Sequence, residues 1–372
     1  MSHFKKTFLS AAVAAATLTA GAAHAYMLGD PNDANVEVYG VVSISAVDYG
    51  ASNDAGPDAG WALENETRVG FRAAKVMTDS VTAFAQVESG WVLDDGAKLG
   101  NRDTFVGLRG DDWGSVRFGR MLTPMYELVD WPYSASNLGR TFDRAWRSGE
   151  RYHFDRKSQM FRYDSPVIGE MVKFSLAGGN GSENHEDSNF FGASISVTPI
   201  DMLTLHAAFE TAEGTHFEDG KNDAIDTNNP TPTPDLPAYI VPGKKASIGD
   251  TDAYFIGFEL RPLDNFNLLG AYKSGSYDST NNGGGYGYKE REIDSYSIQA
   301  NYYFGNANIR VGYADQTGKQ DGRKDKDLDS TSISGEFGYS FNSVYTFVRL
   351  TQQDDAAFDD DLMIRIGTEW VF

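Results

Sequence analysis

Catalysis by a nucleophile and a general base usually depends on a histidine, and this 372-residue sequence has only six. His3 and His24 lie in an N-terminal segment that we expect to be removed. The other four are His153, His185, His206 and His216. Three of these fall in expected loops, no Gly-x-Ser-x-Gly motif occurs, and no Ser-His-acid set can be assigned to one site. The sequence therefore predicts structural or surface histidines and a protein that is not an enzyme.

Acidic residues offer a second kind of chemistry, the binding of hard cations. They crowd one expected loop near the C-terminus, at Asp354, Asp355, Asp359, Asp360 and Asp361. Carboxylate oxygens suit calcium or magnesium, but the spacing is not that of an EF-hand. Two interpretations remain open: a solvated acidic loop, and a loop that bridges lipopolysaccharide through divalent ions. The absence of cysteine excludes disulfides and thiolate metal sites, and we expect no cofactor.

The overall charge of the chain argues against binding to negatively charged partners by electrostatic attraction. Lys and Arg total 32 whereas Asp and Glu total 53, so the formal net charge is -21. We therefore expect no nucleic-acid partner and no electrostatic attraction to anionic lipid headgroups.

The first 25 residues have the pattern of a cleaved export signal. Lys5 and Lys6 form the charged region, 8–20 is the apolar region, and 23–25 supply the small-x-small cleavage site. A membrane-anchoring helix would need about 20 apolar residues, more than this segment contains. We expect the mature chain to be a single domain spanning 26–372 and to leave the cytoplasm.

The secondary structure that positions these side chains is predicted from the period of the hydropathy pattern, which is two residues almost everywhere. Between Tyr296 and Phe304, for example, alternate residues are apolar or aromatic and those between them are mostly polar. Such a period is typical of strands with one apolar and one wet face. A secreted β-sandwich or β-helix shares the period, but its outward face should be polar. Here large apolar residues recur on one face at both ends of the segments.

Sixteen segments of this kind are expected. They span approximately 35–48, 67–76, 79–91, 101–110, 114–119, 159–165, 170–179, 188–198, 202–212, 250–261, 265–277, 291–304, 306–317, 328–341, 343–353 and 361–372. Short links alternate with long polar ones, so one end of the molecule should have tight turns and the other large loops. Because closure leaves no unpaired backbone facing lipid, the sequence predicts an all-β fold, a sixteen-stranded antiparallel transmembrane β-barrel.

Several motifs resemble those of the trimeric general porins of proteobacteria, the Gram-negative porins. They are Glu37–Val41, Thr67–Phe71, Phe105–Gly110 leading to Gly114–Arg120, and Arg162–Pro166. The last strand is similar to the terminal strand that the outer-membrane assembly machinery recognises, with an assembly signal at Trp370 and Phe372. The resemblance covers nearly the whole mature chain and rests on the order and spacing of these motifs.

The resemblance implies that each pore is narrowed by the third outer loop, folded inward. The expected constriction loop is 120–158, and its aromatic residues Tyr126, Trp131 and Tyr133 support this interpretation, because a loop left in water has little reason to be aromatic. The other long connection, 213–249, contains five prolines and is expected to be an extended outer loop.

In the family, carboxylates on the inward loop face basic residues on the barrel wall, and the field between them orients polar solutes. The loop carboxylates here are Glu127 and Asp130. The basic residues with water-facing parity are Arg68, Arg72, Arg117, Arg162, Lys173 and Arg349. Each of them could instead merely pair with a neighbouring acid in a solvated lumen.

A further group of arginines departs from a simple acidic loop. Arg140, Arg144, Arg147 and Arg151 recur at spacings of four, three and four, which would place them on one face of a helix. Acids interrupt the run, so charge pairing within the loop is the alternative. If these arginines point into the pore, the constriction is net basic although the protein is acidic.

The resemblance also implies the location, the partners and the function. We expect a homotrimer in the outer membrane of a Gram-negative bacterium, in contact with lipid, lipopolysaccharide, the assembly machinery and small hydrophilic solutes. The trimer interface should include Val38, Gly40, Ile364 and Ile366. The predicted function is passive diffusion through a water-filled pore. A substrate-selective channel for small anionic or carboxylate solutes would differ only at the constriction, and a structural or adhesive barrel would lack a continuous pore.

Overall fold

A computed structural model gives the structure of this chain. It describes residues 26–28, 35–50, 61–90, 99–134, 138–143, 156–181, 187–217, 247–280, 289–355 and 361–372. The expected signal segment, 1–25, and most of the 213–249 loop lie outside these residues.

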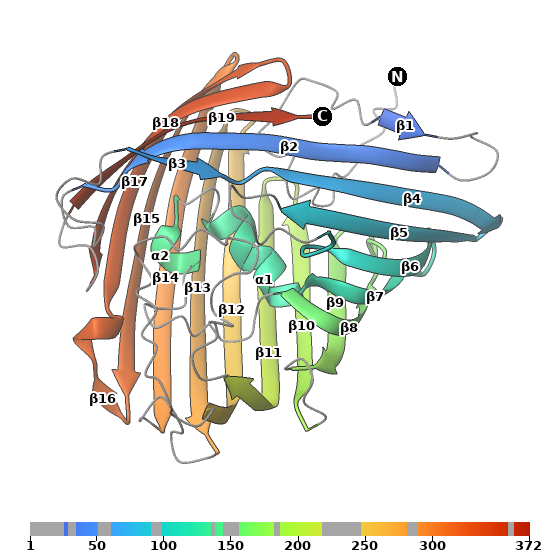
Figure 1. Cartoon of the computed structure of the whole chain (residues 1–372), viewed down its shortest axis with the longest axis horizontal. Helices are drawn as coiled ribbons and strands as arrows, with labels where there is room; N and C mark the ends of the chain where they lie inside the picture. Colours follow the sequence, from blue (N-terminus) through green and yellow to red (C-terminus); the bar gives the residue numbers. More distant parts are fainter. Residues whose placement is uncertain are drawn as a thin grey trace.

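The described residues form nineteen strands in a single sheet (Figure 1). In chain order these are β1 (Tyr26–Leu28), β2 (Asn35–Asp48), β3 (Ala62–Asn65), β4 (Arg68–Thr78), β5 (Val81–Gly90), β6 (Thr104–Gly110), β7 (Gly114–Leu122), β8 (Arg156–Asp164), β9 (Val172–Asn180), β10 (Asn189–Ile200), β11 (Leu203–Phe217), β12 (Ser247–Leu263), β13 (Phe266–Ser279), β14 (Glu290–Phe304), β15 (Ala307–Gln320), β16 (Arg323–Lys324), β17 (Ser330–Phe341), β18 (Val344–Asp355) and β19 (Asp361–Val371).

The sheet closes on itself into a barrel. Consecutive long strands pair antiparallel, and β19 pairs with β2 to complete the ring. The short strands β1, β3 and β16 lie beside longer neighbours, so sixteen strands make the closed ring. Closure pairs both edges of every strand in the ring, which is what a structure in lipid requires because no water is present there to satisfy the backbone.

Side chains alternate between the two faces of the barrel as the period of two predicts. On β14, Tyr296 is 46% and Ile298 50% exposed on the outer face, whereas Ser297 and Gln299 between and beside them are buried on the inner face. The other strands of the ring also carry apolar side chains on the outer face, where the exposed large side chains are mostly Phe, Tyr, Ile, Leu and Val. An apolar exterior and a polar interior are typical of a membrane barrel with an aqueous lumen.

The structure confirms the sixteen expected strands. β2 has the predicted bounds, and most other ends differ by three residues or fewer, although β11 runs five residues further than expected. β7 continues to Leu122 and β8 begins at Arg156, so the long connection between them is shorter than the predicted 120–158. The sequence did not predict the short strands β1, β3 and β16.

The connection between β7 and β8, called the constriction loop from here on, enters the barrel. It contains α1 (Pro124–Leu128), the π-helical turn η1 (Val129–Ser134) and α2 (Arg140–Asp143), which contact strands from β9 to β17 (Figure 1). A short 3-10 turn, η2 (Lys326–Leu328), precedes β17. Among the described residues, no helix has the length and apolar character needed to cross a membrane.

Candidate functional site

The constriction loop begins with a well-formed helix cap. Pro124 occupies the first turn of α1, where its missing N–H is not needed, and the Thr123 side chain accepts a hydrogen bond from the N–H of Tyr126 at 3.2 Å. The Thr123 hydroxyl also donates to the Glu210 carboxylate on β11 at 2.6 Å. The sequence at this point therefore both starts the helix and attaches it to β11.

The underside of the loop is apolar and packs on an apolar part of the inner wall. Met125, Val129, Tyr133 and Phe142 of the loop are buried together with Ala253, Phe255, Leu269, Tyr277, Ile293 and Ala314 of β12 to β15. The inner face of these strands is therefore not uniformly wet, which differs from the simple alternation that the sequence predicts. Burial of this many large side chains is the main force that holds the loop inside the barrel.

Backbone groups of the loop are fixed at several points beyond this apolar contact. The Tyr133 carbonyl accepts hydrogen bonds from the Ser297 hydroxyl at 2.9 Å and from the Gln299 amide. The loop lies directly on glycine, because a Cβ atom at Gly257 would come within 2.7 Å of the Tyr133 ring. Larger residues at that position would hold the loop away from the wall.

One side of the loop meets a charged group that we call the loop clamp, made of Arg117 on β7, Arg162 and Asp164 on β8, and Glu127 on α1. Arg162 is 3% exposed and donates to Glu127 and, from Nη1, to the Leu122 carbonyl at 3.0 Å. Its Nε donates to Asp164 Oδ1 at 2.9 Å. Arg117 donates to Asp164 Oδ2 at 2.6 Å. Two arginines and two carboxylates thus neutralise each other where the loop leaves the wall.

The ion pair with Arg162 controls the ionisation of Glu127. Burial by itself would raise the pKa of Glu127, but attraction to Arg162 outweighs that effect and holds the pKa below its ordinary value near 4.5. Glu127 is therefore ionised throughout the neutral range, and its bond to Arg162 persists into mildly acidic solution.

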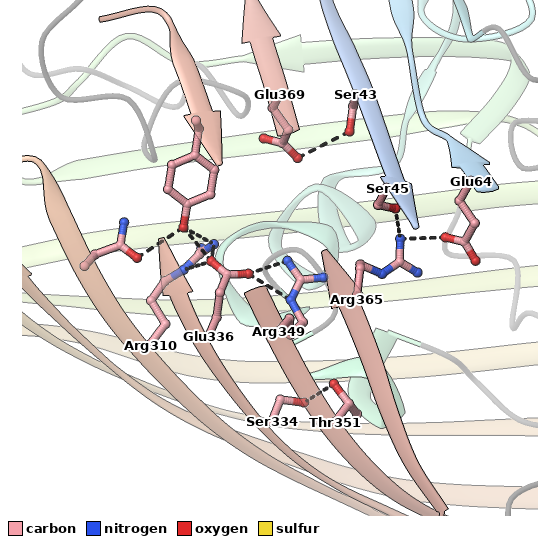
Figure 2. A network of polar contacts seen from close by, with 12 residues as sticks. Ser43, Ser45, Glu64, Arg310, Ser334, Glu336, Arg349, Thr351, Arg365 and Glu369 are labelled. Atoms are coloured by element: carbon pink, nitrogen blue, oxygen red, sulfur yellow. Dashed lines mark hydrogen bonds and ion pairs between the residues drawn. The ribbon is translucent and has the colours of Figure 1, made fainter. Parts of the chain in front are cut away.

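A second charged group, the far-wall cluster, consists of Arg310 on β15, Glu336 on β17 and Arg349 on β18 (Figure 2). The Glu336 side chain is fully buried and accepts from Arg310 Nε at 2.9 Å and from Arg349 Nε at 2.8 Å. The Tyr345 hydroxyl donates to the same carboxylate at 2.6 Å. All three charged side chains lie in one row across adjacent strands, so the cluster joins β15, β17 and β18 to one another.

This row continues to the seam at which the barrel closes. Arg365 on β19 lies opposite Arg349 in the register and forms an ion pair of 2.5 Å with Glu64 on β3, while donating to the Ser45 hydroxyl of β2 at 2.9 Å (Figure 2). The first and last strands are therefore joined by side chains as well as by the backbone ladder.

The remaining basic candidates differ in how far they are paired. Arg72 is exposed, stacks on the Tyr39 ring at 3.7 Å and donates to Gln86 at 3.1 Å. Arg68 lies on the same face of β4 and is attracted to Glu88, but within the part of the chain that the structure describes its side chain forms no hydrogen bond or close ion pair. The side chain of Lys173, half-buried at the start of β9, likewise has no hydrogen bond or close ion pair with the described residues.

The other predicted loop residues are only partly covered by the structure. Asp130 is the second residue of η1 and is half-buried. Arg140 is buried, with Nη1 at 3.4 Å from the Met363 sulfur on β19. Arg144, Arg147 and Arg151 lie outside the described residues, so the arginine stripe stays a prediction, although α2 ends at Asp143 and Arg140 itself points at the wall.

One histidine forms contacts that the sequence did not predict. His206 on β11 accepts from or donates to the Ser196 hydroxyl of β10 at 2.8 Å, and its Nε2 lies 3.2 Å from Glu259 on β12. The order of contacts is that of a nucleophile, a base and an orienting acid. However, Ser196 lies in a strand paired on both sides, so neighbouring backbone N–H groups are engaged in the ladder rather than arranged to stabilise an oxyanion. This trio is a polar link between three strands.

The C-terminal residues complete the seam. Phe372 exchanges two backbone hydrogen bonds with Gly40, at 3.0 and 3.1 Å, and Trp370 is half-exposed with its indole N–H donating to the Ser343 hydroxyl.

The acidic candidates for metal binding are only partly covered by the structure. Asp359 and Asp360 lie outside the described residues, as do the side chains of Asp355 and Asp361, and Asp354 is exposed. The described part of the chain holds no group of three or more potential ligands placed to bind a metal ion.

Several residues that shape the lumen were absent from the sequence-based candidates. These are Asp164, Glu210, Arg310, Glu336, Arg365 and Glu64. Parity alone places Asp164, Arg310 and Glu336 on the wet face, because each alternates with apolar neighbours. What parity cannot give is the partner of each charge, since the partners are up to 320 residues apart along the chain.

Comparison with known proteins agrees with this architecture. The family described as Gram-negative porin matches residues 11–356. A chitoporin of Vibrio furnissii is 36% identical over 389 aligned residues, 99% of each chain. A monosaccharide porin of a Halomonas species is 30% identical over 39% of this chain and 40% of its own. Among solved structures, the trimer form of OmpT of Vibrio cholerae has a TM-score of 0.67 at 13% identity and covers 91% of this chain and all of its own, which is a likeness of fold.

Proposed function

The chain belongs to the Gram-negative porin family and is an outer-membrane channel, and we propose that the constriction loop forms its size filter against the β4 side of the ring. The single observation that carries this proposal is a closed sixteen-stranded barrel with a loop held inside it. The loop contacts run from β8 round to β19, whereas Arg68 and Arg72 lie on the part of the ring outside that arc. Diffusion through such a gap needs no catalytic residue, and we propose none.

The charges that a solute meets are fewer than the sequence suggests. Arg162 is buried between Glu127 and Asp164, and Arg349 is buried and shares the Glu336 carboxylate with Arg310, so the fields of both arginines are reduced at a distance. Among the residues that the structure describes, Arg68 and Lys173 have no such close partner, and we assign them the leading role on the basic side of the pore. On the acidic side the loop carries Glu127 and Asp130, and the charge of Glu127 is in turn matched by Arg162. The anion preference that an excess of arginine would give therefore depends on these unmatched cations rather than on the whole set.

A second candidate function is preference for amino-sugar oligosaccharides. The relative that matches 99% of this chain is named for chitin. In the constriction loop, Trp131 is partly exposed although its neighbours Pro132 and Tyr133 are buried against the wall. An exposed indole face is a suitable platform for a sugar ring, because the C–H groups of the ring pack on aromatic faces. This observation favours a sugar over the carboxylate solutes of the other selective alternative.

We also propose that the channel is a homotrimer that meets its copies at the seam. The outer surface of β17, β18, β19 and β2 has an apolar groove lined by Ile44, Phe337, Tyr339, Val348 and Ile366. Val38, Gly40 and Ile364 belong to the same strands. The remaining outer surface would contact lipid and lipopolysaccharide. Phe372 and Trp370 keep their predicted role as the signal for the assembly machinery.

Conductance in planar bilayers tests the main proposal. A trimer of open pores should insert as large, ohmic openings that close in three equal steps, and solute-swelling assays should show a size limit set by the constriction loop. A pure, folded protein that gives no conductance would contradict the channel.

The second candidate function is tested by blocking of the current with sugars. Chitin oligosaccharides should interrupt the current more often than maltose oligosaccharides of equal length, and Trp131→Ala should abolish that difference. Equal blocking by both sugars would remove the sugar preference.

A further inference from the structure

Asp164 is the centre of the loop clamp. Its Oδ2 accepts from Arg117 Nη2 at 2.6 Å. Its Oδ1 accepts from Arg162 Nε at 2.9 Å and from the Ser175 hydroxyl at 2.7 Å. The residue is 8% exposed, so water competes little for these positions. One carboxylate therefore fixes two arginines, from two adjacent strands, at once.

The geometry of Arg162 shows what Asp164 does for the loop. A guanidinium group is planar, and binding one of its edges fixes the directions of all its donors. With Nε on Asp164, the group presents Nη1 to the Leu122 carbonyl and Nη2 to Glu127, the two points at which the loop leaves the wall. Without Asp164, the remaining strand side chain that accepts from the guanidinium, within the described residues, would be the Ser175 hydroxyl at 3.4 Å from Nη2.

Charge gives Asp164 a second effect. The loop clamp holds two positive and two negative charges and is neutral as a group. Arg117 is only partly buried, with an 18% exposed side chain, and its Nε is buried without a hydrogen-bond partner. Over the described ranges, its one close ion pair is with Asp164. Arg117 is therefore a lumen cation that this single carboxylate keeps from contributing its charge to the pore.

We propose that Asp164 limits the anion preference of the channel, by neutralising Arg117 and by positioning Arg162 to hold the constriction loop. It is a positioning residue, since it acts through the two arginines rather than on the solute. The proposal rests on the proposed channel function and names the residue that sets the charge of that same constriction. It also explains why the count of lumen arginines alone overestimates the positive potential of the pore.

The test is the reversal potential of bilayer currents in a KCl gradient, measured at low and high salt. Asp164→Asn keeps the shape and one acceptor oxygen but leaves the clamp with a net charge of one. We expect the chloride-to-potassium permeability ratio to rise on the order of threefold at low salt and less at high salt, because salt screens the added field. The double variant Arg117→Gln with Asp164→Asn restores neutrality and should return the ratio to the wild-type value.

Two further variants keep the proposal falsifiable if Asp164→Asn does not fold. Arg117→Gln alone leaves the clamp one charge negative and should shift the ratio by a similar factor toward potassium. Asp354→Asn removes one carboxylate at the exposed outer end of β18 and should leave the ratio unchanged.

The outcomes separate the two levels of the argument. Wild-type protein without conductance would overturn the channel itself. Open channels of Asp164→Asn or Arg117→Gln with an unchanged permeability ratio would overturn the role of Asp164 and leave the channel intact. The role of Asp164 in ion selectivity would also be overturned if Asp164→Asn lowered only the melting temperature of the trimer, since the loss of a merely structural residue would have that effect.

Discussion

The loop clamp and the far-wall cluster use one arrangement, a carboxylate between two arginines, for different ends. In the far-wall cluster Arg310 and Arg349 both direct Nε and Nη2 to Glu336, and the Tyr345 hydroxyl donates to the same carboxylate, so these contacts all stay within the wall. In the loop clamp, Arg162 keeps donors for the loop. The difference teaches that the lumen arginines are not equivalent, and that a donor left over for the loop links a wall arginine to the position of that loop.

The comparison predicts the largest change in stability for Glu336→Gln. The substitution leaves two buried arginines without their shared carboxylate, and breaking a buried ion pair in this way costs about 3 to 5 kcal/mol. The melting temperature of the trimer, followed on mild-detergent gels, should fall markedly, while Asp354→Asn serves as the exposed control. A stable trimer of normal melting temperature would mean that the far wall does not depend on this cluster.

Removal of one arginine from each cluster should separate loop position from wall stability. Arg162→Ala removes the donors to Leu122 and Glu127, and each lost hydrogen bond to a charged group is worth about 1.5 to 3 kcal/mol. Its channels should show higher and noisier conductance, and the loop should be cut faster by protease. Arg349→Ala should lower the melting temperature with quiet, wild-type conductance. The same phenotype for both variants would contradict the distinction between the clusters.

A smaller effect is expected where the loop rests on the wall by shape alone. Gly257→Ala introduces a methyl group 2.7 Å from the Tyr133 ring, so the loop must shift, at about 1 to 3 kcal/mol for overpacking. Single-channel conductance should change, without a change in ion selectivity because no charge is involved. Gly335→Ala is the matched control, since its methyl group would meet nothing within 4 Å. Equal conductance of the two variants would show that the contact at Gly257 does not set the loop position.

The smallest effect is that of pH on the loop clamp. The pKa of Glu127 lies below its ordinary value near 4.5, so its ion pair with Arg162 stabilises the docked loop fully above that value and is lost only as the pH falls through the lowered pKa. Conductance noise should therefore stay constant from pH 7 to about pH 4.5 and rise below it. Glu127→Gln should be noisier at neutral pH and lack this acid-dependent rise. A rise in wild-type noise near pH 6 would point to another group.

The strands were the part of the molecule that the sequence predicted best. Alternation of apolar and polar residues is a local property of two successive positions, and lipid on one side and water on the other impose it on every strand. The even number of segments and the alternation of short and long links then gave closure and orientation. The inward loop could be predicted from Tyr126, Trp131 and Tyr133, whose burial the structure largely confirms for the two tyrosines.

What only the tertiary structure decided is the partner of each charge and the floor on which the loop rests. Parity placed Arg117, Arg162 and Arg349 on the wet face, but not Glu336 against Arg349 or Asp164 against Arg117. Those pairings depend on the register between strands, and a shift of one residue moves a side chain to the other face. Phe255 has inner parity although it is apolar, because the loop and not water covers it. The register between neighbouring strands and the contacts of the loop thus determine which arginines remain for solutes.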